Sequence, residues 1–217
     1  MKSFKAALFD LDGVVFDTEP QYTMFWGSQF HKYYPEAKGL EQQIKGQTLV
    51  QIYERYFKGR QQVQSDITKE LDEFELNMSF EYIDGLVGFL ESLRSNNIHT
   101  AIVTSSNNAK MQTVYKKCPS IRTFFDEILT SEDFTQSKPS PECYLKAASR
   151  FGANPSECVV FEDSFNGLKS GRAAEMYVVG LATTNDMESI RPYSDSVISD
   201  YKGLNYEKIC ALMAPSH

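Results

Sequence analysis

Two carboxylates lie two residues apart at a point where the sequence turns. Asp10 and Asp12 follow the apolar run 6–9, and Gly13 comes directly after them. One carboxylate of such a pair can attack phosphorus while the other acts as a general acid on the leaving oxygen. Asp side chains in turns also bond neighbouring backbone N–H groups, so the spacing alone favours a structural turn. A catalytic role for the pair is favoured only if it lies at the carboxyl end of a buried strand.

A second acidic pair, Glu162 and Asp163, follows the apolar run 158–161. Two carboxylates and a phosphate repel one another, so a divalent cation is needed, and oxygen ligands point to Mg²⁺. We assign Asp163 to the metal together with Asp10 and Asp12. Glu162 is either a further ligand, direct or through water, or a residue that orients the loop. Taken alone, the pair is typical of a helix N-terminus.

Two further segments could hold a phosphate. Thr104, Ser105 and Ser106 follow the apolar run 100–103 and open a predicted helix, where hydroxyls and free N–H groups can bind phosphate oxygens. Lys138 precedes a proline that restricts the backbone and could fix the direction of the ammonium group. Each feature has an ordinary structural explanation, but their order after successive core runs favours one site.

The elements that must position these residues alternate between strands and helices. Apolar runs at 6–9, 100–103, 158–161 and 176–179 predict buried parallel strands, with helical periodicity between them. This pattern predicts an α/β fold with a doubly wound parallel sheet, which binds ligands at the carboxyl ends of its strands. The four segments would therefore meet at one edge.

The stretch from about residue 20 to 80 breaks this alternation. It predicts an inserted helical cap whose three apolar stripes pack on one another, with residues 58–68 as a polar connection between helices. The stripes are Tyr22, Phe25, Trp26 and Phe30, then Leu49, Ile52, Tyr53, Tyr56 and Phe57, then Ile67, Leu71, Phe74 and Met78. We expect a catalytic core of residues 1–17 and 83–217, and a cap of residues 18–82.

Composition narrows the class of partner. The 217 residues are 41% hydrophobic and 24% charged, as in globular proteins, and we expect no membrane span, no signal peptide and a cytoplasmic location. The four cysteines lack zinc spacing and are expected to be reduced. A net charge of −7 disfavours nucleic acid and leaves a small phosphorylated metabolite as the expected partner. Nothing in the composition predicts an oligomeric state.

In sequence order, these motifs resemble those of the haloacid dehalogenase superfamily, in particular its branch of β-phosphoglucomutases and sugar-phosphate phosphatases. The resemblance rests on Asp10-Leu11-Asp12-Gly13-Val14, Thr104, Lys138-Pro139, and Glu162-Asp163 followed by Gly167. It spans nearly the whole chain. A dehalogenase would need neither this metal site nor Asp12 as an acid.

The resemblance implies a role for each motif. Asp10 would form a phosphoaspartate, and Asp12 would protonate the leaving group and then activate water. Asp10, the Asp12 carbonyl and Asp163 would hold Mg²⁺, while Thr104 and Lys138 would bind the phosphoryl group. It also implies a Rossmann-like core whose cap opens and closes, with hinges at residues 17–20 and about 82–85.

Residues of the cap indicate whether water, as in a phosphatase, or a sugar phosphate, as in a mutase, receives the phosphoryl group. Tyr22 stands where the resembling mutases have a histidine, and Leu49 stands where they have an arginine for a distal phosphate. The turn Gly46, Gln47 and Thr48 resembles a cap loop that sorts leaving groups. These departures favour a magnesium-dependent phosphatase acting on a small phosphomonoester such as a sugar phosphate. A phosphosugar mutase, a pyrophosphatase and a phospho-ligand-binding protein are the alternatives.

Overall fold

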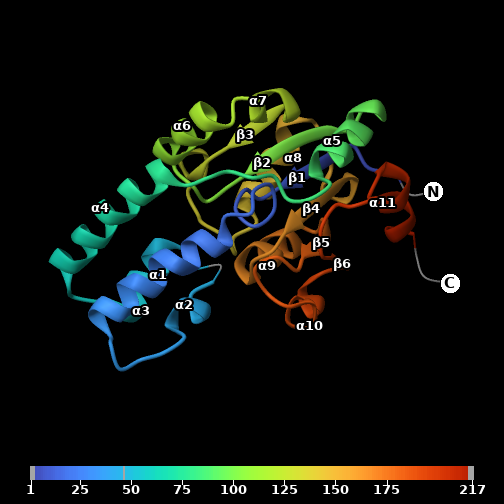
Figure 1. Cartoon of the computed structure of the whole chain (residues 1–217). Coiled ribbons are helices and arrows are strands. Elements are labelled where there is room, and N and C mark those ends of the chain that lie inside the picture. Colours follow the sequence, from blue (N-terminus) through green and yellow to red (C-terminus); the bar gives the residue numbers. More distant parts are fainter. Residues whose placement is uncertain (1–2, 46, 215–217) are drawn as a thin grey trace.

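The structure is a computed structural model that describes residues 3–45 and 47–214, and its centre is a parallel β-sheet (Figure 1). Within these ranges six strands lie in the order β3-β2-β1-β4-β5-β6, and every neighbouring pair is parallel. The strands are β1 (Ala6–Phe9), β2 (His99–Val103), β3 (Glu127–Leu129), β4 (Cys158–Glu162), β5 (Tyr177–Leu181) and β6 (Ser196–Ile198). The predicted doubly wound sheet is confirmed. Strands β3 and β6 were not predicted, because a strand of three residues is too short to show a recognisable apolar run.

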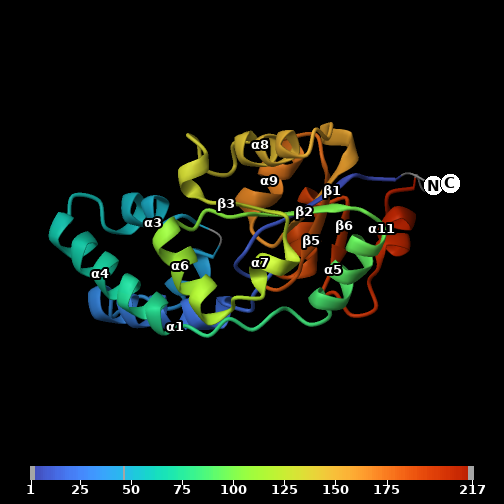
Figure 2. The same cartoon turned by 90° about the horizontal axis from the view of Figure 1, so that it is seen from above.

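Helices cover both faces of the sheet, which gives three layers (Figure 2). The α-helices of this part are α5 (Leu86–Ser95), α6 (Asn108–Lys117), α7 (Ile121–Phe124), α8 (Glu142–Arg150), α9 (Phe165–Ala173), α10 (Met187–Ile190) and α11 (Tyr206–Leu212). Short 3₁₀ turns span Ser131–Asp133, Pro155–Glu157 and Arg191–Tyr193. Successive residues of β1 point to opposite faces of the sheet. Ala7 and Phe9 pack in a cluster with residues of α5. Ala6 and Leu8 pack on the other face, against residues of α8 and α9.

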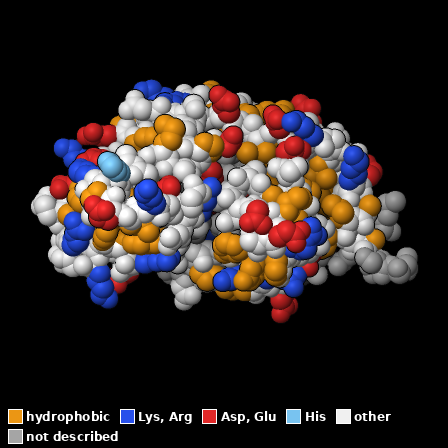
Figure 3. Space-filling view, turned by 60° about the horizontal axis from the view of Figure 1, so that its bottom comes forward, with side chains coloured by type: hydrophobic (Ala, Val, Ile, Leu, Met, Phe, Trp, Pro, Cys, Tyr) orange, Lys and Arg blue, Asp and Glu red, His pale blue; other side chains and the backbone are white. Residues whose placement is uncertain are grey.

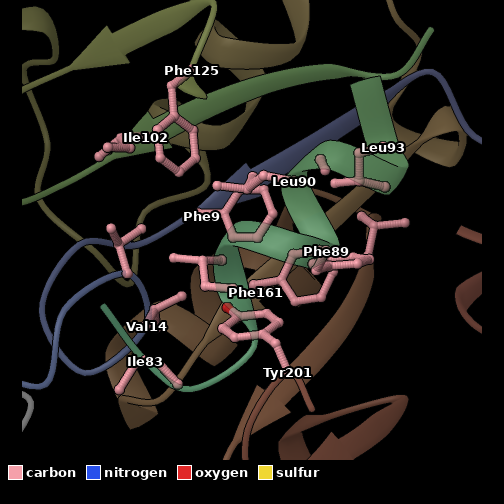
Figure 4. Close-up of a cluster of buried hydrophobic side chains, with 14 of the residues drawn as sticks. Phe9, Val14, Ile83, Phe89, Leu90, Leu93, Ile102, Phe125, Phe161 and Tyr201 are labelled. Carbon is pink, nitrogen blue, oxygen red and sulfur yellow. The ribbon is translucent and has the colours of Figure 1, made fainter. Parts of the chain in front are cut away.

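Aromatic side chains fix the middle of the sheet (Figure 4). Phe9 of β1 stacks on Phe161 of β4 with ring centroids 4.6 Å apart, and Phe89 of α5 stacks on Tyr201 at 5.5 Å. All four are buried, and burial of one such side chain contributes about 1.5–3 kcal/mol. Because Phe9 and Phe161 come directly before Asp10 and Glu162, this packing also fixes those acidic residues.

Four helices lie between β1 and α5 in the sequence and project from one end of the sheet (Figure 1). These helices, called the helical insert below, are α1 (Glu19–Tyr33), α2 (Leu40–Gln43), α3 (Leu49–Tyr56) and α4 (Gln61–Asn77). They share a cluster that includes Phe25, Trp26, Ile52 and Ile67. The predicted stripes therefore do pack on one another. Met78 is buried but lies outside that cluster.

The prediction that residues 58–68 form a connection is wrong for most of its length. Helix α4 already begins at Gln61, and only residues 57–60 connect it to α3. Val63 and Ile67 pack in the insert's cluster together with Leu71 and Phe74, so the apolar stripe starts one turn earlier than predicted. The polar residues between them occupy the solvated face of an amphipathic helix.

The two chain segments that enter and leave the insert lie side by side. Phe16 forms an isolated bridge with Tyr82, and Asp17 N–H donates to the Glu81 carbonyl at 2.9 Å. The division into a core and a cap at residues 18 and 82 stays a prediction, as do the hinges. No helix in residues 3–45 or 47–214 has the length and apolar character that crossing a membrane requires.

Candidate active site

Asp10 lies at the carboxyl end of β1, where the chain turns sharply. Its N–H donates to the Phe161 carbonyl of β4 at 3.0 Å, so the residue still follows the sheet. Gly13 has a φ of +73°, which favours glycine, and its N–H donates to the Phe16 carbonyl at 2.8 Å. The turn thus directs the chain from the sheet edge towards the insert.

Lys138 joins two of the predicted acidic residues. Its Nζ lies 2.6 Å from Asp10 Oδ1 and 2.7 Å from Glu162 Oε1, and it donates to the Val103 carbonyl at 2.9 Å. The lysine side chain is only 4% exposed. The three donors of its ammonium group are therefore matched by three acceptors from three strand ends.

Glu162 is fully buried, and both its carboxylate oxygens accept hydrogen bonds from the protein. Oε1 accepts from Lys138 and, at 2.8 Å, from the Tyr144 hydroxyl. Oε2 accepts from the N–H groups of Asp163 and Ser164 at 3.1 and 3.3 Å, and from the Ser164 hydroxyl at 3.2 Å. These contacts are of the kind expected for a residue that orients the loop, and a role of Glu162 as a metal ligand, direct or through water, stays a prediction.

Asp163 is held by the loop after β5. The Thr184 hydroxyl donates to Asp163 Oδ2, and the Asn185 amide donates to the Asp163 carbonyl at 3.0 Å. Neither Thr184 nor Asn185 was predicted, because nothing in their local sequence marks a contact with a residue that precedes them by 21 and 22 positions. A third missed residue is Tyr144, whose predicted helix gave no sign that its hydroxyl reaches Glu162.

Three carboxylates gather where a metal ion could lie. One oxygen from each of Asp10, Glu162 and Asp163 can be chosen so that all three lie within 4.8 Å of one another. Burial raises the pKa of Asp10 to about 7, although Lys138 opposes the rise. Burial, and then the charge of Glu162, raises the pKa of Asp163 above its usual range. The single positive charge of Lys138 does not balance the three carboxylates, so negative charge remains in excess. An oxygen-binding divalent cation fits this donor set.

Asp12 points away from that group. Its Oδ1 accepts from the Thr18 hydroxyl at 2.7 Å, and its Oδ2 accepts from the Ser106 hydroxyl at 3.3 Å. Lys110 of α6 also reaches Oδ2, at 2.5 Å. The carboxylate of Asp12 is thus held separately from the acidic cluster, and a role of its backbone carbonyl in metal binding stays a prediction.

The predicted phosphate-binding residues line the same cavity, which has a volume of about 540 Å³. Thr104, Ser105 and Ser106 reach it from the segment before α6, and Lys138 reaches it from the loop between β3 and α8. Within this segment the Ser106 N–H donates to the Thr104 hydroxyl at 3.0 Å. The sequence analysis therefore named residues that the fold does bring together.

The predicted cap residues differ in the contacts that they make around the cavity. Tyr22 lines the cavity and its hydroxyl donates to Glu75 Oε1 at 2.8 Å. Thr48 lines the cavity too and caps α3 by accepting from the Gln51 N–H at 3.3 Å. Gln47 and Leu49 are further lining residues. Gly46, the remaining predicted residue of that turn, lies outside the described residues.

Charge in the cavity is uneven. The described residues that line it from the insert include four carboxylates, Glu19, Glu41, Asp72 and Glu75, but a single lysine, Lys45. On the outer face drawn in Figure 3, in contrast, Lys and Arg side chains are interspersed with Asp and Glu. The excess of negative charge is thus a property of the insert side of the cavity.

Comparison with known proteins identifies the class. The family model of haloacid dehalogenase-like hydrolases matches residues 4–175, and the chain belongs to this family of enzymes. It is 24% identical to validoxylamine A 7'-phosphate phosphatase of Streptomyces hygroscopicus subsp. limoneus, covering 95% of this chain and 98% of that protein. It is 28% identical to hexitol phosphatase A of Escherichia coli strain K12, covering 84% and 85%.

A solved structure agrees with the fold. β-Phosphoglucomutase of Clostridium difficile superposes with a TM-score of 0.79 at 24% identity, covering 96% of each chain. The resemblance inferred from the four motifs is therefore confirmed at the level of family and fold.

Proposed function

We propose that this enzyme hydrolyses small phosphomonoesters, such as sugar phosphates, with Mg²⁺ as cofactor and a phosphoaspartate as intermediate. The observation that carries the proposal is the position of Lys138, whose ammonium group bridges Asp10 and Glu162 beside Asp163 at the base of the cavity. A nucleophile, a phosphate-binding cation and a group of metal-binding oxygens thus share one place. Relatives named as phosphatases support the same reaction.

The residues divide the reaction into two steps. A carboxylate oxygen of Asp10 attacks phosphorus, the bond from phosphorus to the ester oxygen breaks, and Asp12 gives its proton to the departing alkoxide. In the second step Asp12 takes a proton from water, whose oxygen attacks phosphorus and releases inorganic phosphate and free Asp10. Lys138 and the hydroxyl of Thr104 bind the transferring group.

A metal ion would be held by Asp10, Asp163 and the Asp12 carbonyl. When bound, Mg²⁺ supplies positive charge that stabilises the phosphoryl oxygens in the transition state. Glu162 fixes Lys138 and the 162–164 loop rather than the ion, because its oxygens already have protein partners.

Features of the cavity favour water over a second sugar phosphate as acceptor. A mutase must hold a bisphosphate, yet the insert lines the cavity with four carboxylates and one lysine. Leu49 adds no cation at the position where the resembling mutases carry an arginine for the distal phosphate, and Tyr22 replaces their histidine. The same charge disfavours pyrophosphate, since like charges nearby cost several kcal/mol. The class of metabolite rests on the sequence and on these relatives, whereas a cytoplasmic location is an expectation from the sequence alone.

A substrate panel tests the proposal. Phosphate release is measured from sugar phosphates, nucleotides, p-nitrophenyl phosphate and pyrophosphate, with Mg²⁺ and with EDTA. We expect metal-dependent turnover of at least one monoester and none by Asp10→Asn. Absence of turnover for the whole panel contradicts the proposal. Isomerised sugar phosphate without stoichiometric phosphate release, in the presence of a bisphosphate activator, would establish the mutase instead.

A further inference from the structure

A second buried lysine, Lys110, lies at the boundary between the sheet and the insert. It belongs to the first turn of α6, and its side chain is only 4% exposed. Its Nζ lies 2.5 Å from Asp12 Oδ2 and 4.9 Å from the centre of the Tyr22 ring. Lysines are almost never buried to this degree unless they are paired, so the position requires its partners.

Partners from both parts of the chain surround this ammonium group. Asp12 follows β1, whereas Tyr22 belongs to α1 and is hydrogen-bonded to Glu75 of α4. The face of the Tyr22 ring attracts the cation, and a desolvated contact of this kind contributes about 2 kcal/mol. Burial raises the pKa of Glu75, and the positive charge of Lys110 opposes that rise.

We infer that Lys110 is a positioning residue that fixes the carboxylate of Asp12 towards the leaving oxygen. Thr18 holds one oxygen of Asp12 and Lys110 holds the other, which leaves little freedom for rotation of the carboxyl group. The Tyr22 ring contacts Lys110 and Glu75 holds the Tyr22 hydroxyl, so the insert contributes to the orientation of Asp12. This inference rests on the proposed function, because it assigns a support to the proposed general acid.

Two substrates whose leaving groups differ in basicity distinguish a positioning role of Lys110 from other roles. A sugar phosphate releases an alkoxide that needs a proton, whereas p-nitrophenolate is a much weaker base and departs without one. For Lys110→Met we expect kcat/KM to fall about 100-fold on a sugar phosphate, the scale of general acid catalysis, and by less than about 5-fold on p-nitrophenyl phosphate. Using kcat/KM confines the comparison to steps up to release of the alcohol.

Two variants complete the comparison. Lys110→Arg retains the charge and should stay within about 10-fold of wild type on the sugar phosphate, allowing for the different shape of the guanidinium. In an Asp12→Asn background, Lys110→Met should cause no further loss on the sugar phosphate, because its effect acts through Asp12. Lys116→Met on the exposed face of the same helix is the control and should match wild type.

The outcomes that contradict the inference are distinct. Equal falls on both substrates indicate general damage to the site, and a rise in KM with unchanged kcat indicates that Lys110 binds substrate. Either result overturns the positioning role while leaving the proposed function intact. Absence of turnover by the wild type contradicts the proposed function itself. If Lys110→Met does not fold, Lys110→Gln, which keeps a donor for Asp12, is measured with the same two substrates and the same criteria.

Discussion

Gly167 lies directly against the carboxylate of Glu162. A Cβ atom added to Gly167 would lie 1.8 Å from Glu162 Oε1 and 2.1 Å from Oε2. The absence of a side chain at the first turn of α9 therefore makes room for the carboxylate, which binds Lys138 through Oε1. Packing against Glu162 thus explains why the residue that follows the Glu162-Asp163 motif at position 167 is glycine, which the sequence could not reveal.

Gly167→Ala should displace Glu162 and disturb the contact of Lys138 with Asp10. We expect unfolding free energy to fall by about 1–3 kcal/mol, as for other overpacked interiors, together with a loss of phosphatase activity. Urea unfolding and steady-state kinetics measure the two effects. Gly88→Ala is the matched control, since that helical glycine has open space around it and alanine should stabilise α5 by up to about 1 kcal/mol. Wild-type stability and activity in Gly167→Ala would contradict the expectation.

Gly13→Ala should impair metal binding in addition to straining the backbone. An added Cβ would lie 2.2 Å from Asp163 Oδ2 and 2.8 Å from the Thr184 hydroxyl. Gly39 has the same φ of +73° but no atom within 4 Å of the added Cβ, so Gly39→Ala carries the same strain of about 1–2 kcal/mol without the crowding. In Mg²⁺ titrations of activity, only Gly13→Ala should need more metal. Equal Mg²⁺ requirements for the two variants would exclude an effect on Asp163.

Removal of the metal should abolish turnover, and addition of Mg²⁺ should restore it. An ion that binds only the native state also raises its stability, so the melting temperature should increase with Mg²⁺ concentration. Asp163→Asn should lose this increase, because Asp163 is one of the clustered oxygen donors. Asp66→Asn, an exposed change on α4, should keep it. The same melting curve for wild type and Asp163→Asn would argue against the proposed ligand.

Glu19→Gln should change how stability depends on pH. Burial, followed by the charge of Asp12, raises the pKa of Glu19 from 4.5 to about 7 in the folded protein. The folded state therefore holds this proton more tightly than the unfolded state, so stability falls as pH rises from about 4.5 through 7. Relative to wild type, the Gln variant should gain up to about 3 kcal/mol between pH 5 and pH 8. Urea unfolding in EDTA at both pH values measures this, and a pH-independent difference would refute it.

The sequence by itself determined where the chemistry could occur along the chain. Three of the polar motifs follow a run of buried residues, and the carboxyl ends of parallel strands meet at one edge, so Asp10, Thr104 and Asp163 could be expected together. Lys138 needed the family resemblance as well, because it follows no predicted strand. The helical insert was visible as a break in the alternation, although the start of α4 was placed too late.

Only the tertiary structure decided which groups hold those residues. Lys110 belongs to a polar helix turn, yet its side chain is buried, where the Tyr22 ring of α1 contacts it and Asp12 pairs with it. Thr184 contacts Asp163 across the sheet edge, between segments that are separate in the sequence. The sequence left Glu162 with two possible roles, and only the structure shows that Lys138, Tyr144 and the 163–164 segment are its hydrogen-bond partners. Periodicity reports which face of an element is apolar, but the partners of a buried polar atom depend on how distant segments approach one another in space.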